Sequence, residues 1–391
     1  MLAEDVRALT FEDYVATIRA FTDEELIPAE PEMVRLGEVP PRLVDRMAGL
    51  GLFAITLGPE HGGLGWSVEQ QVLLTMEFTR ASVVYRSRFS TTIGLVSQAV
   101  AAHGTEDQRA RLLPEFAAGR TVAAFALTEE SAGTDATAVR TTAVADGDGF
   151  VLNGSKRYIT NGHWADVLLV FARHEESSAL SAFLVDRTAA GVTTRVPEQM
   201  NGHAEGPVAE IDLVDVRVGR ADLLGGVEGQ GLRQAMRGIN HARIHVAATA
   251  VGQATRLLQE ATEHAASRHQ FGQPLLELGA LQSMLGRSYA ELEAGRALVV
   301  DCAREFDRVG PPRERISAAK LYCTEMASAV ADRAVQVLGG AGIVGPHAVP
   351  RMWRDVRALR IYEGASQLHE RNLARALPTL LSTSDERNPH A

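Results

Sequence analysis

The residue with the clearest potential for chemistry is Glu363, in the segment Ile361-Tyr362-Glu363-Gly364-Ala365 near the C-terminus. Gly364 beside it lets the backbone approach a ligand closely. A helix-like run upstream carries arginines at Arg351, Arg354, Arg357 and Arg360. An acid placed here could act as a general base, or it could be a helix-end carboxylate paired with an arginine. Taken alone, this segment favours the second interpretation. The choice between the two roles of Glu363 depends on the other segments of the chain.

Two central segments carry groups that could hold a planar polar ring or a phosphate. Phe125 to Asp135 combines a strand, hydroxyl groups and a glycine loop, and Tyr158 to Gly162 places an aromatic ring and a hydroxyl just before a turn. Backbone N–H groups and threonine hydroxyls at a strand end can bind such ligands. The alternatives are a strand followed by a serine/threonine turn, and an ordinary hairpin edge.

A third segment, Arg268 to Pro274, ends a long helical run with a cation and an aromatic ring. This combination can bind a pyrophosphate and stack on a ring, although an arginine at a helix C-terminus is also favoured by the helix dipole. A literal G-x-G-x-x-G lies at Gly340 to Gly345. It follows the helical run Ala329 to Leu338 instead of a strand, so it predicts a helix-ending turn whose glycines could still approach a cofactor.

Metal and acyl-enzyme chemistry find no support in the sequence. His241 and His245 have the i, i+4 spacing of a helix face, but no third ligand or catalytic Glu accompanies them, so we expect packing or solvent contacts and no metal. Cys302 and Cys323 form no nucleophile signature, and two cysteines are too few for a disulfide scaffold.

Helical signals dominate the first third of the chain. An amphipathic run begins at Pro41 and continues to Gly51, and Ser67 with Gln70 and Thr105 with Gln108 form two capping boxes. From about Val122 to Val218 the pattern changes to short strands. The expected strands include Ala165 to Arg173 and Ser181 to Arg187, with turns at Asp146 to Gly149, Asn153-Gly154 and Asn161-Gly162.

Long helical runs follow at Leu232 to Arg268, Ala280 to Arg308 and Arg313 to Leu338, and their length suits a helix bundle. We therefore predict an α+β chain with three domains. They are an N-terminal helical domain (1–121), a middle antiparallel β domain (122–230) and a C-terminal four-helix-bundle domain (231–391).

The composition restricts the possible partners. The chain has 391 residues and a net charge of −10, which argues against nonspecific binding to nucleic acid and to membrane surfaces. Its first twenty residues carry acids and lack a basic stretch followed by an apolar core, so we expect no secretory signal. With no apolar run of membrane-spanning length and two cysteines, a reducing cytoplasm is the expected location.

Together these segments resemble the acyl-CoA dehydrogenase family of flavoenzymes, from about Phe11 to Leu377. The motifs that carry the resemblance are Gly62-Gly63-Leu64-Gly65, Gly104 to Gln108, Leu127 to Asp135, Leu152 to Gly162, Arg268 to Pro274, Gln336 to Gly340 and Ile361 to Gln367. The resemblance implies a homotetramer in which each subunit places FAD between the β domain and the C-terminal bundle.

The resemblance also implies roles for individual residues. The flavin ring would be lined by Phe125, Leu127, Thr128, Tyr158 and Thr160. The pyrophosphate and adenosine end would be held, partly across a subunit interface, by Arg268, Phe271, Gln336, Gly339 and Gly340. Gly133 and Thr134 would lie near the pantetheine arm, Arg243 near the coenzyme A portion, and Gly364 beside the reacting thioester.

Glu363 would be the base that removes the α-proton of an acyl-CoA or acyl-carrier thioester while a hydride passes from Cβ to flavin N5. Some family members carry this base on a helix, immediately before the arginine that matches Arg243, but here that position is Ala242. The electron acceptor would be an electron-transfer flavoprotein. A flavin oxidase or monooxygenase of the same fold and a noncatalytic helical scaffold are the alternatives, and the retained Glu363 and Arg268 argue against the scaffold.

Several positions depart from the family pattern. Ala365 stands where the family usually has Thr, Gly279 where Gln is frequent and Glu130 where Pro is common. The segment Tyr85 to Ser90 resembles the glutaryl-CoA branch, in which an arginine at the position of Arg86 binds a distal carboxylate. That branch has a Glu where this chain has Thr79, so Arg86 could also be a surface or interface residue.

Overall fold

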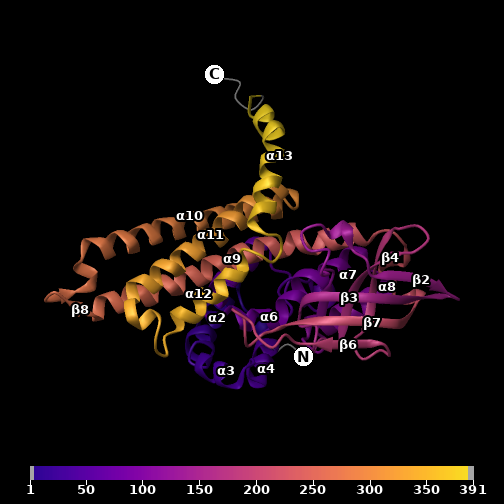
Figure 1. Ribbon diagram of the computed structural model, residues 1–391, viewed down its shortest axis with the longest axis horizontal. Helices are drawn as coiled ribbons and strands as arrows, with labels where there is room; N and C mark the ends of the chain where they lie inside the picture. The colour runs from indigo at the N-terminus through magenta and orange to yellow at the C-terminus, as the bar shows by residue number, and fades with distance from the viewer. Residues whose placement is uncertain (1–3, 386–391) are drawn as a thin grey trace. The chain divides into compact units, whose positions relative to one another are not determined.

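The computed structural model describes residues 4–385, which form two compact units divided between Ala242 and Arg243 (Figure 1). The terminal residues of the first and third predicted domains, 1–3 and 386–391, lie outside the described residues. Within residues 4–385, none of the helices combines the length and the apolar composition needed to cross a bilayer.

The first unit begins with helices that pack around a large apolar core. They are α1 (Glu4–Arg7), α2 (Phe11–Phe21), α3 (Glu30–Leu36), α4 (Pro41–Gly49), α5 (Val68–Phe78), α6 (Val83–Thr91), α7 (Ser97–His103) and α8 (Glu106–Ala117). Tyr14, Phe53, Phe78 and Phe89 are among the fully buried side chains of this core. Both predicted capping boxes are present, at the start of α5 and of α8. The helix predicted from Pro41 ends two residues early, at Gly49.

A seven-stranded sheet follows in the order β1-β4-β2-β3-β7-β6, with β5 beside β4. Its strands are β1 (Ala123–Ala126), β2 (Thr142–Asp146), β3 (Gly149–Thr160), β4 (Val167–His174), β5 (Leu180–Asp186), β6 (Val192–Arg195) and β7 (Val208–Gly219). The predicted antiparallel arrangement is confirmed for β2–β3, β3–β7, β4–β5 and β6–β7. It needs one correction, because β4 runs parallel to β1 and to β2.

The predicted turns at Asp146 to Gly149 and at Asn161-Gly162 are confirmed at the two ends of β3. The turn predicted at Asn153-Gly154 is wrong, because these residues lie inside β3. The pairing of β3 with β7 shifts between Leu152 and Gly154. The Asn-Gly pair therefore marks a bulge, which a strand interior tolerates at glycine.

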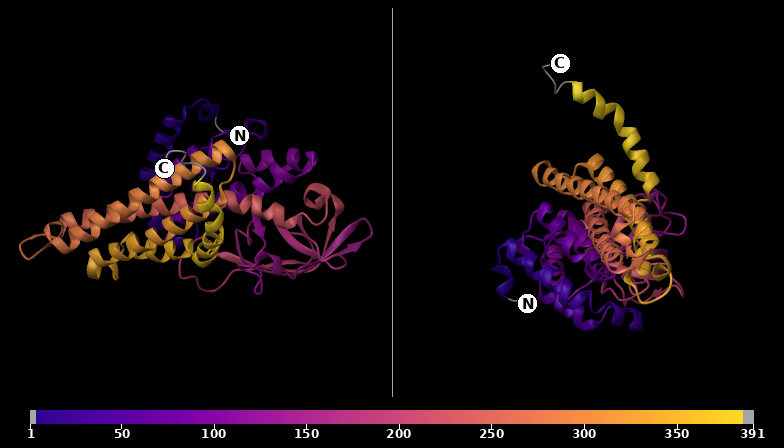
Figure 2. Two further views of the ribbon diagram at one scale, coloured as in Figure 1. Left: turned by 90° about the horizontal axis from the view of Figure 1, so that it is seen from above. Right: turned by 90° about the vertical axis from the view of Figure 1, so that its left-hand side faces the viewer.

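The second unit is helical. The long helix α9 (Gly231–Ser267) enters it at Arg243, and α10 (Gly279–Val309), α11 (Arg313–Leu338), α12 (Ala348–Leu359) and α13 (Ser366–Asp385) follow. A short hairpin of β8 (His269–Gln270) and β9 (Gln273–Pro274) joins α9 to α10. The three predicted long helices match α9, α10 and α11 to within a residue or two at each end. Figures 1 and 2 show α10, α11 and α12 side by side, with α11 in contact with α10, α12 and α13.

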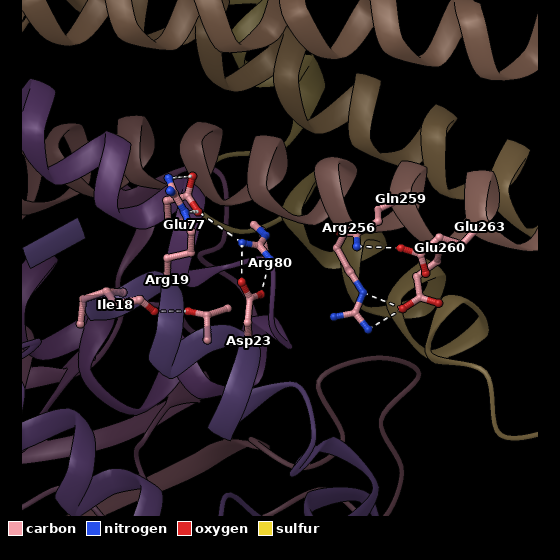
Figure 3. A network of polar contacts seen from close by, with 10 residues as sticks. Ile18, Arg19, Asp23, Glu77, Arg80, Arg256, Gln259, Glu260 and Glu263 are labelled. Atoms are coloured by element: carbon pink, nitrogen blue, oxygen red, sulfur yellow. Dashed lines mark hydrogen bonds and ion pairs between the residues drawn. The ribbon is translucent and has the colours of Figure 1, made fainter. Parts of the chain in front are cut away.

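Ion pairs and side-chain hydrogen bonds link residues within each unit (Figure 3). In the first, Glu77 of α5 accepts from Arg19 of α2 (3.1 Å) and lies 3.4 Å from Arg80, which also pairs with Asp23. In the second, Arg256 pairs with Glu260 along α9, and Gln259 donates to Glu263 (2.8 Å).

Candidate active site

Glu363 lies in the turn between α12 and α13, with its side chain half-buried. Its φ is +56° and that of Gly364 is +103°. A non-glycine residue in the left-handed region is uncommon and such strain concentrates at functional sites. A Cβ at Gly364 would lie 3.0 Å from His369 Nε2 and 3.0 Å from Leu368 Cδ2, so only glycine fits there without displacement.

Two cations from other helices bind the backbone of this turn. Arg243 of α9 donates from Nε to the Glu363 carbonyl (3.0 Å), and Lys320 of α11 donates from Nζ to the Gly364 carbonyl (2.6 Å). Burial lowers the pKa of Arg243, and the negative charge of Glu363 opposes this. The structure therefore brings together three of the predicted site residues, Arg243, Glu363 and Gly364, although Arg243 is 120 residues from Glu363 in sequence.

The alternative interpretation of Glu363 assigned its carboxylate to an upstream arginine. Two of those arginines have carboxylate partners elsewhere, since Arg351 lies 3.5 Å from Asp355 and Arg360 lies 2.7 Å from Glu325. A carboxylate at a helix end also does not require a left-handed backbone, or hydrogen bonds from Arg243 and Lys320 to the turn's carbonyls. The role of Glu363 as a general base stays a prediction at this point.

In the first unit, the loop after β1 carries the predicted ring-binding residues Leu127 and Thr128. Leu127 is buried and Thr128 half-buried, and the Thr128 carbonyl accepts from the backbone N–H of Arg157 on β3 (2.9 Å). Thr160 at the end of β3 is also half-buried. Within residues 4–385, no protein group bonds to the hydroxyl of Thr128 or of Thr160. Half-buried hydroxyls of this kind suit the polar edge of a flavin ring, so these residues fit an FAD.

Tyr158 lies at a second bulge in β3. The pairing with β7 shifts between Lys156 and Ile159, Tyr158 has a φ of +59°, and its ring is 70% exposed. Phe125 on β1 is half-buried and packs against Phe171, with ring centroids 4.8 Å apart. Gly133 and Thr134 lie exposed in the loop after β1.

A buried ion pair connects the loop after β1 to β3. Lys156 is fully buried and its Nζ lies 2.7 Å from Glu129 Oε1. The Glu129 carboxylate also accepts from the backbone N–H groups of Arg140 (2.7 Å) and Thr141 (3.0 Å). Burial opposes ionisation of Glu129, but Lys156 and these donors outweigh it and hold its pKa below the usual value. The ammonium also donates to the Phe171 carbonyl (2.7 Å) and so ties the loop to β3 and β4.

Arg86 on α6 is half-buried beside a small cavity in the first unit. The cavity is otherwise lined by Leu52, Ile55, Leu74, Thr75, Phe78 and Phe89. The positive charges of Arg237 and Arg86 help burial to lower the pKa of His241 to about 3. His241 and His245 are both buried, and His241 Nε2 lies 3.1 Å from Gln71 Oε1. Packing thus accounts for the two histidines.

The remaining predicted residues lie at the far end of the bundle. Arg268 directly follows α9, and Phe271 at the tip of the hairpin is 90% exposed. Gln336, Gly339 and Gly340 are exposed at the end of α11. Nearby, His264 of α9 and His347, the residue before α12, have ring centroids 5.9 Å apart. Arg268 is separated from Arg243 by roughly 37 Å along α9, so the structure does not bring this group to Glu363 within one chain.

Two contributors were missed by the sequence interpretation, Lys156 and Lys320. Lys156 lies in a strand, next to Arg157, and Lys320 lies in an apolar part of a helix, and the partner of each is distant in sequence. One signal was available, because these are the only two lysines in the sequence.

Comparisons with known proteins follow the same three-part order. The chain matches the family descriptions "Acyl-CoA dehydrogenase, N-terminal domain" over residues 10–120, "middle domain" over 124–216 and "C-terminal domain" over 229–377. Subunit CarC of the caffeyl-CoA reductase-Etf complex of Acetobacterium woodii is 34% identical, covering 90% of this chain and 94% of that protein. The short-chain specific acyl-CoA dehydrogenase of Homo sapiens mitochondria is 33% identical, with 92% and 88% covered.

Among solved structures, a glutaryl-CoA dehydrogenase from Mycobacterium smegmatis in complex with FADH2 superimposes with a TM-score of 0.89. It is 30% identical in sequence, and the match covers 96% of this chain and 95% of that one.

Proposed function

The chain belongs to the acyl-CoA dehydrogenase family, is an FAD-dependent oxidoreductase of acyl thioesters, and we propose that Glu363 is the base that removes the α-proton of its substrate. The observation that carries this proposal is the Glu363-Gly364 turn, with a left-handed glutamate clamped through its own and its neighbour's carbonyl. Ala242 supports it, because the alternative base position has no carboxylate.

The chemistry explains why the base must be held so firmly. The α-proton of a thioester is only weakly acidic, so the base must be positioned and partly desolvated while the carbonyl oxygen is polarised by hydrogen-bond donors. Glu363 is half-buried and fixed by Arg243 and Lys320, and its backbone N–H is the proposed protein donor to the thioester carbonyl. FAD, when bound, supplies the hydride acceptor.

We assign the cofactor contacts as the family resemblance suggests. Phe125, Leu127, Thr128, Tyr158 and Thr160 would hold the flavin ring, and the two half-buried threonine hydroxyls support this. Arg268, Phe271, Gln336, Gly339 and Gly340 would hold the pyrophosphate and adenosine end. Gly133 and Thr134, exposed beside the ring-binding loop, would contact the pantetheine arm, with Arg243 and Gly364 on the thioester side.

Replacing the base tests the central proposal. Glu363→Gln keeps the size of the side chain but cannot accept the proton, so the purified protein should remain yellow with FAD. Its flavin bleaching by a thioester under anaerobic conditions should slow by about 10²- to 10⁴-fold. Glu370→Gln, which changes an exposed carboxylate on α13, is the matched control and should bleach normally. Undiminished bleaching by Glu363→Gln would exclude Glu363 as the base.

We propose a carboxylated or polar acyl group as the substrate, bound through Arg86. The resemblance of the segment Tyr85 to Ser90 to the glutaryl-CoA branch supports this. The similarity to a glutaryl-CoA dehydrogenase is consistent with such a substrate.

Arg86→Ala should slow bleaching by a dicarboxylic thioester about 100-fold more than bleaching by a neutral thioester of equal length, because a charged hydrogen bond is lost. Arg88→Ala is the matched control, since Arg88 lies on another face of α6 and stacks 3.6 Å over Trp164. Equal losses for both thioesters in Arg86→Ala would make Arg86 structural.

The natural electron acceptor is proposed to be an electron-transfer flavoprotein, which the Etf complex of the Acetobacterium relative supports. A purified electron-transfer flavoprotein should reoxidise the bleached enzyme faster than oxygen does. Faster oxidation by oxygen would instead favour the oxidase alternative.

We propose a homotetramer, in which Arg268 serves the cofactor of a neighbouring subunit. Its separation from Arg243 along α9 supports this, as do exposed apolar side chains of the second unit. These include Phe271, Tyr289, Ile343, Val344 and Trp353. A sedimentation mass of one chain at working concentration would contradict it.

A cytoplasmic location and the three domains 1–121, 122–230 and 231–391 are also proposed. Cys302 and Cys323 are buried free thiols, which suits a reducing compartment. The change from helix to strand after Ala117 and the return to helix at Gly231 support the domain boundaries.

A further inference from the structure

The sequence contains only two lysines, Lys156 and Lys320, and arginine provides all its other strongly basic side chains. Both lysines are fully buried, whereas lysine is almost never fully buried unless it has a partner. Lysine and arginine are not interchangeable in a closely packed site, because the ammonium is a compact charge on a flexible side chain and the guanidinium is a broad planar group. The two lysines therefore place a compact ammonium at buried positions, in a chain whose other strongly basic side chains are guanidinium groups.

Lys156 has an obvious partner in Glu129, but Lys320 does not. Its Nζ donates one hydrogen bond within the described residues, to the Gly364 carbonyl at 2.6 Å. This carbonyl belongs to the residue after Glu363, and both residues have positive φ. The ammonium therefore holds the strained turn from the side of α11, while Arg243 holds it from α9.

Charged groups from every surrounding element act on Lys320. Glu363 of the turn and Glu325 of α11 favour its charged form, whereas Arg243 of α9, Arg360 of α12 and burial oppose it. His369 of α13 lies beside the same turn, with its Nε2 facing Gly364. Burial has the largest effect and lowers the pKa of Lys320 to about 8. A buried ammonium with one neutral acceptor needs a nearby carboxylate, and Glu363 is the acid whose charge acts most strongly on it.

α11 also fixes the other end of the turn. Glu325 accepts from Arg360 Nε (2.7 Å) before the turn and from Ser366 Oγ (2.5 Å) after it. The turn and its flanking residues are thus attached to α11 at three points, Arg360, Gly364 and Ser366, with the Lys320 contact in the middle.

We propose that Lys320 is a positioning residue for the reaction: its ammonium holds the Gly364 carbonyl, and its charge keeps the Glu363 carboxylate ionised and in place. This inference rests on the proposed role of Glu363 as base. The coupling is reciprocal, so each group must change the titration of the other.

The two lysines allow a direct measurement on the intact FAD-loaded protein. Labelling with [ε-¹³C]lysine gives two side-chain resonances, and the one missing in Lys320→Met belongs to Lys320. We expect this resonance to titrate near pH 8 in the wild type and to shift lower by about one unit in Glu363→Gln, since an opposite charge has been removed. Titration near 10.5, or a midpoint unchanged by Glu363→Gln, would overturn the inference.

Kinetics provide the second readout. Lys320→Met, which keeps the length but loses the charge and the donor, should bleach about 10- to 100-fold more slowly at pH 7 and raise the pH midpoint of bleaching by about one unit. Lys156→Met is the matched control, because it also removes a fully buried ammonium. The bleaching activity that Lys156→Met retains should have the same pH midpoint as the wild type. A shift of equal size in both variants would show a general effect of burial and contradict the positioning role.

Lys320→Arg keeps the charge if Lys320→Met does not fold, and it should retain the wild-type midpoint with a reduced rate. A raised midpoint in Lys320→Arg would overturn the inference. Failure of the proposed function looks different: Glu363→Gln would bleach at full rate while the lysine titration still responded to it.

Discussion

At the scale of single residues, the conformation of Gly364 is as important as the carboxylate beside it. Its φ of +103° and the 3.0 Å distance that would separate a Cβ at this position from His369 and Leu368 are two separate obstacles to any side chain. Gly364→Ala should therefore lower the free energy of unfolding by about 2 to 4 kcal/mol and slow flavin bleaching by at least about 10-fold, because the turn must move. Urea unfolding and anaerobic bleaching measure the two effects.

Gly310 offers a matched control for this substitution. Its φ is +85°, but a Cβ there meets no atom within 4 Å. Gly310→Ala should cost only the conformational part, about 1 kcal/mol, and leave bleaching unchanged. If the two variants lost equal stability and activity, the contacts around Gly364 would not be what restricts that position.

Sequence reasoning reached Glu363, Gly364 and Arg243, but it missed Lys320, which holds the turn from α11. An acid beside a glycine is visible locally, whereas Lys320 lies 44 residues from the carbonyl it binds. A lone lysine in a helix gives no local sign of which carbonyl it will meet. Only the scarcity of lysine in this chain could have drawn attention to it.

At the scale of elements, the two capping boxes look alike in sequence but differ in what they stabilise. Gln70 accepts from the Ser67 backbone at the start of α5 and makes a local cap. Gln108 does the same for Thr105 and also donates to Ala221 (2.8 Å) and Leu223 (2.9 Å) and accepts from Gly225 (2.9 Å). The second cap therefore attaches α8 to the segment that follows β7.

Gln108→Ala should lower the free energy of unfolding of the first unit by about 3 to 4 kcal/mol, since several buried backbone groups lose their partner at once. Gln70→Ala, the matched control, should cost about 1 kcal/mol. Chemical denaturation compares the two. Similar losses would mean that the long-range hydrogen bonds of Gln108 contribute little beyond the cap.

Helix boundaries were predictable because caps and the helical period are local signals. The sheet was less so. Asn153-Gly154 has the composition of a turn, but β2 and β7 pair with β3 on either side and keep it extended through both residues. The parallel alignment of β4 with β1 and β2 arises from the path of the chain between strands, which no strand pattern encodes.

At the scale of the whole chain, the α, β, α order was predictable from the change of hydrophobic period. The charged surroundings of individual buried residues within each unit were not. Each unit also buries a histidine in a positively charged setting. Burial, with Arg237 and Arg86, lowers the pKa of His241 to about 3, and burial, with Lys320 and Arg243, lowers that of His369 to about 4. Neither effect is visible from the sequence around either histidine.

These histidines predict how stability depends on pH. Both pKa values fall on folding from about 6.5, so the unfolded chain binds more protons below that pH. Their contribution is fully present above pH 6.5 and is lost as the pH falls toward 4 for His369 and toward 3 for His241. Each should lower the free energy of unfolding of its unit by about 1.4 kcal/mol per pH unit in this range.

Replacing one histidine at a time should separate the two units. His369→Gln should flatten the acid loss of stability between pH 6.5 and 4.5 in the second unit and leave the first unchanged, and His241→Gln should do the reverse. Because two units need not unfold together, urea unfolding at each pH is best read by brief hydrogen–deuterium labelling at one fixed pH, with peptides from β3 and from α11 reporting the units separately. If both variants kept the wild-type slope in both units, carboxylates rather than these histidines would govern acid unfolding.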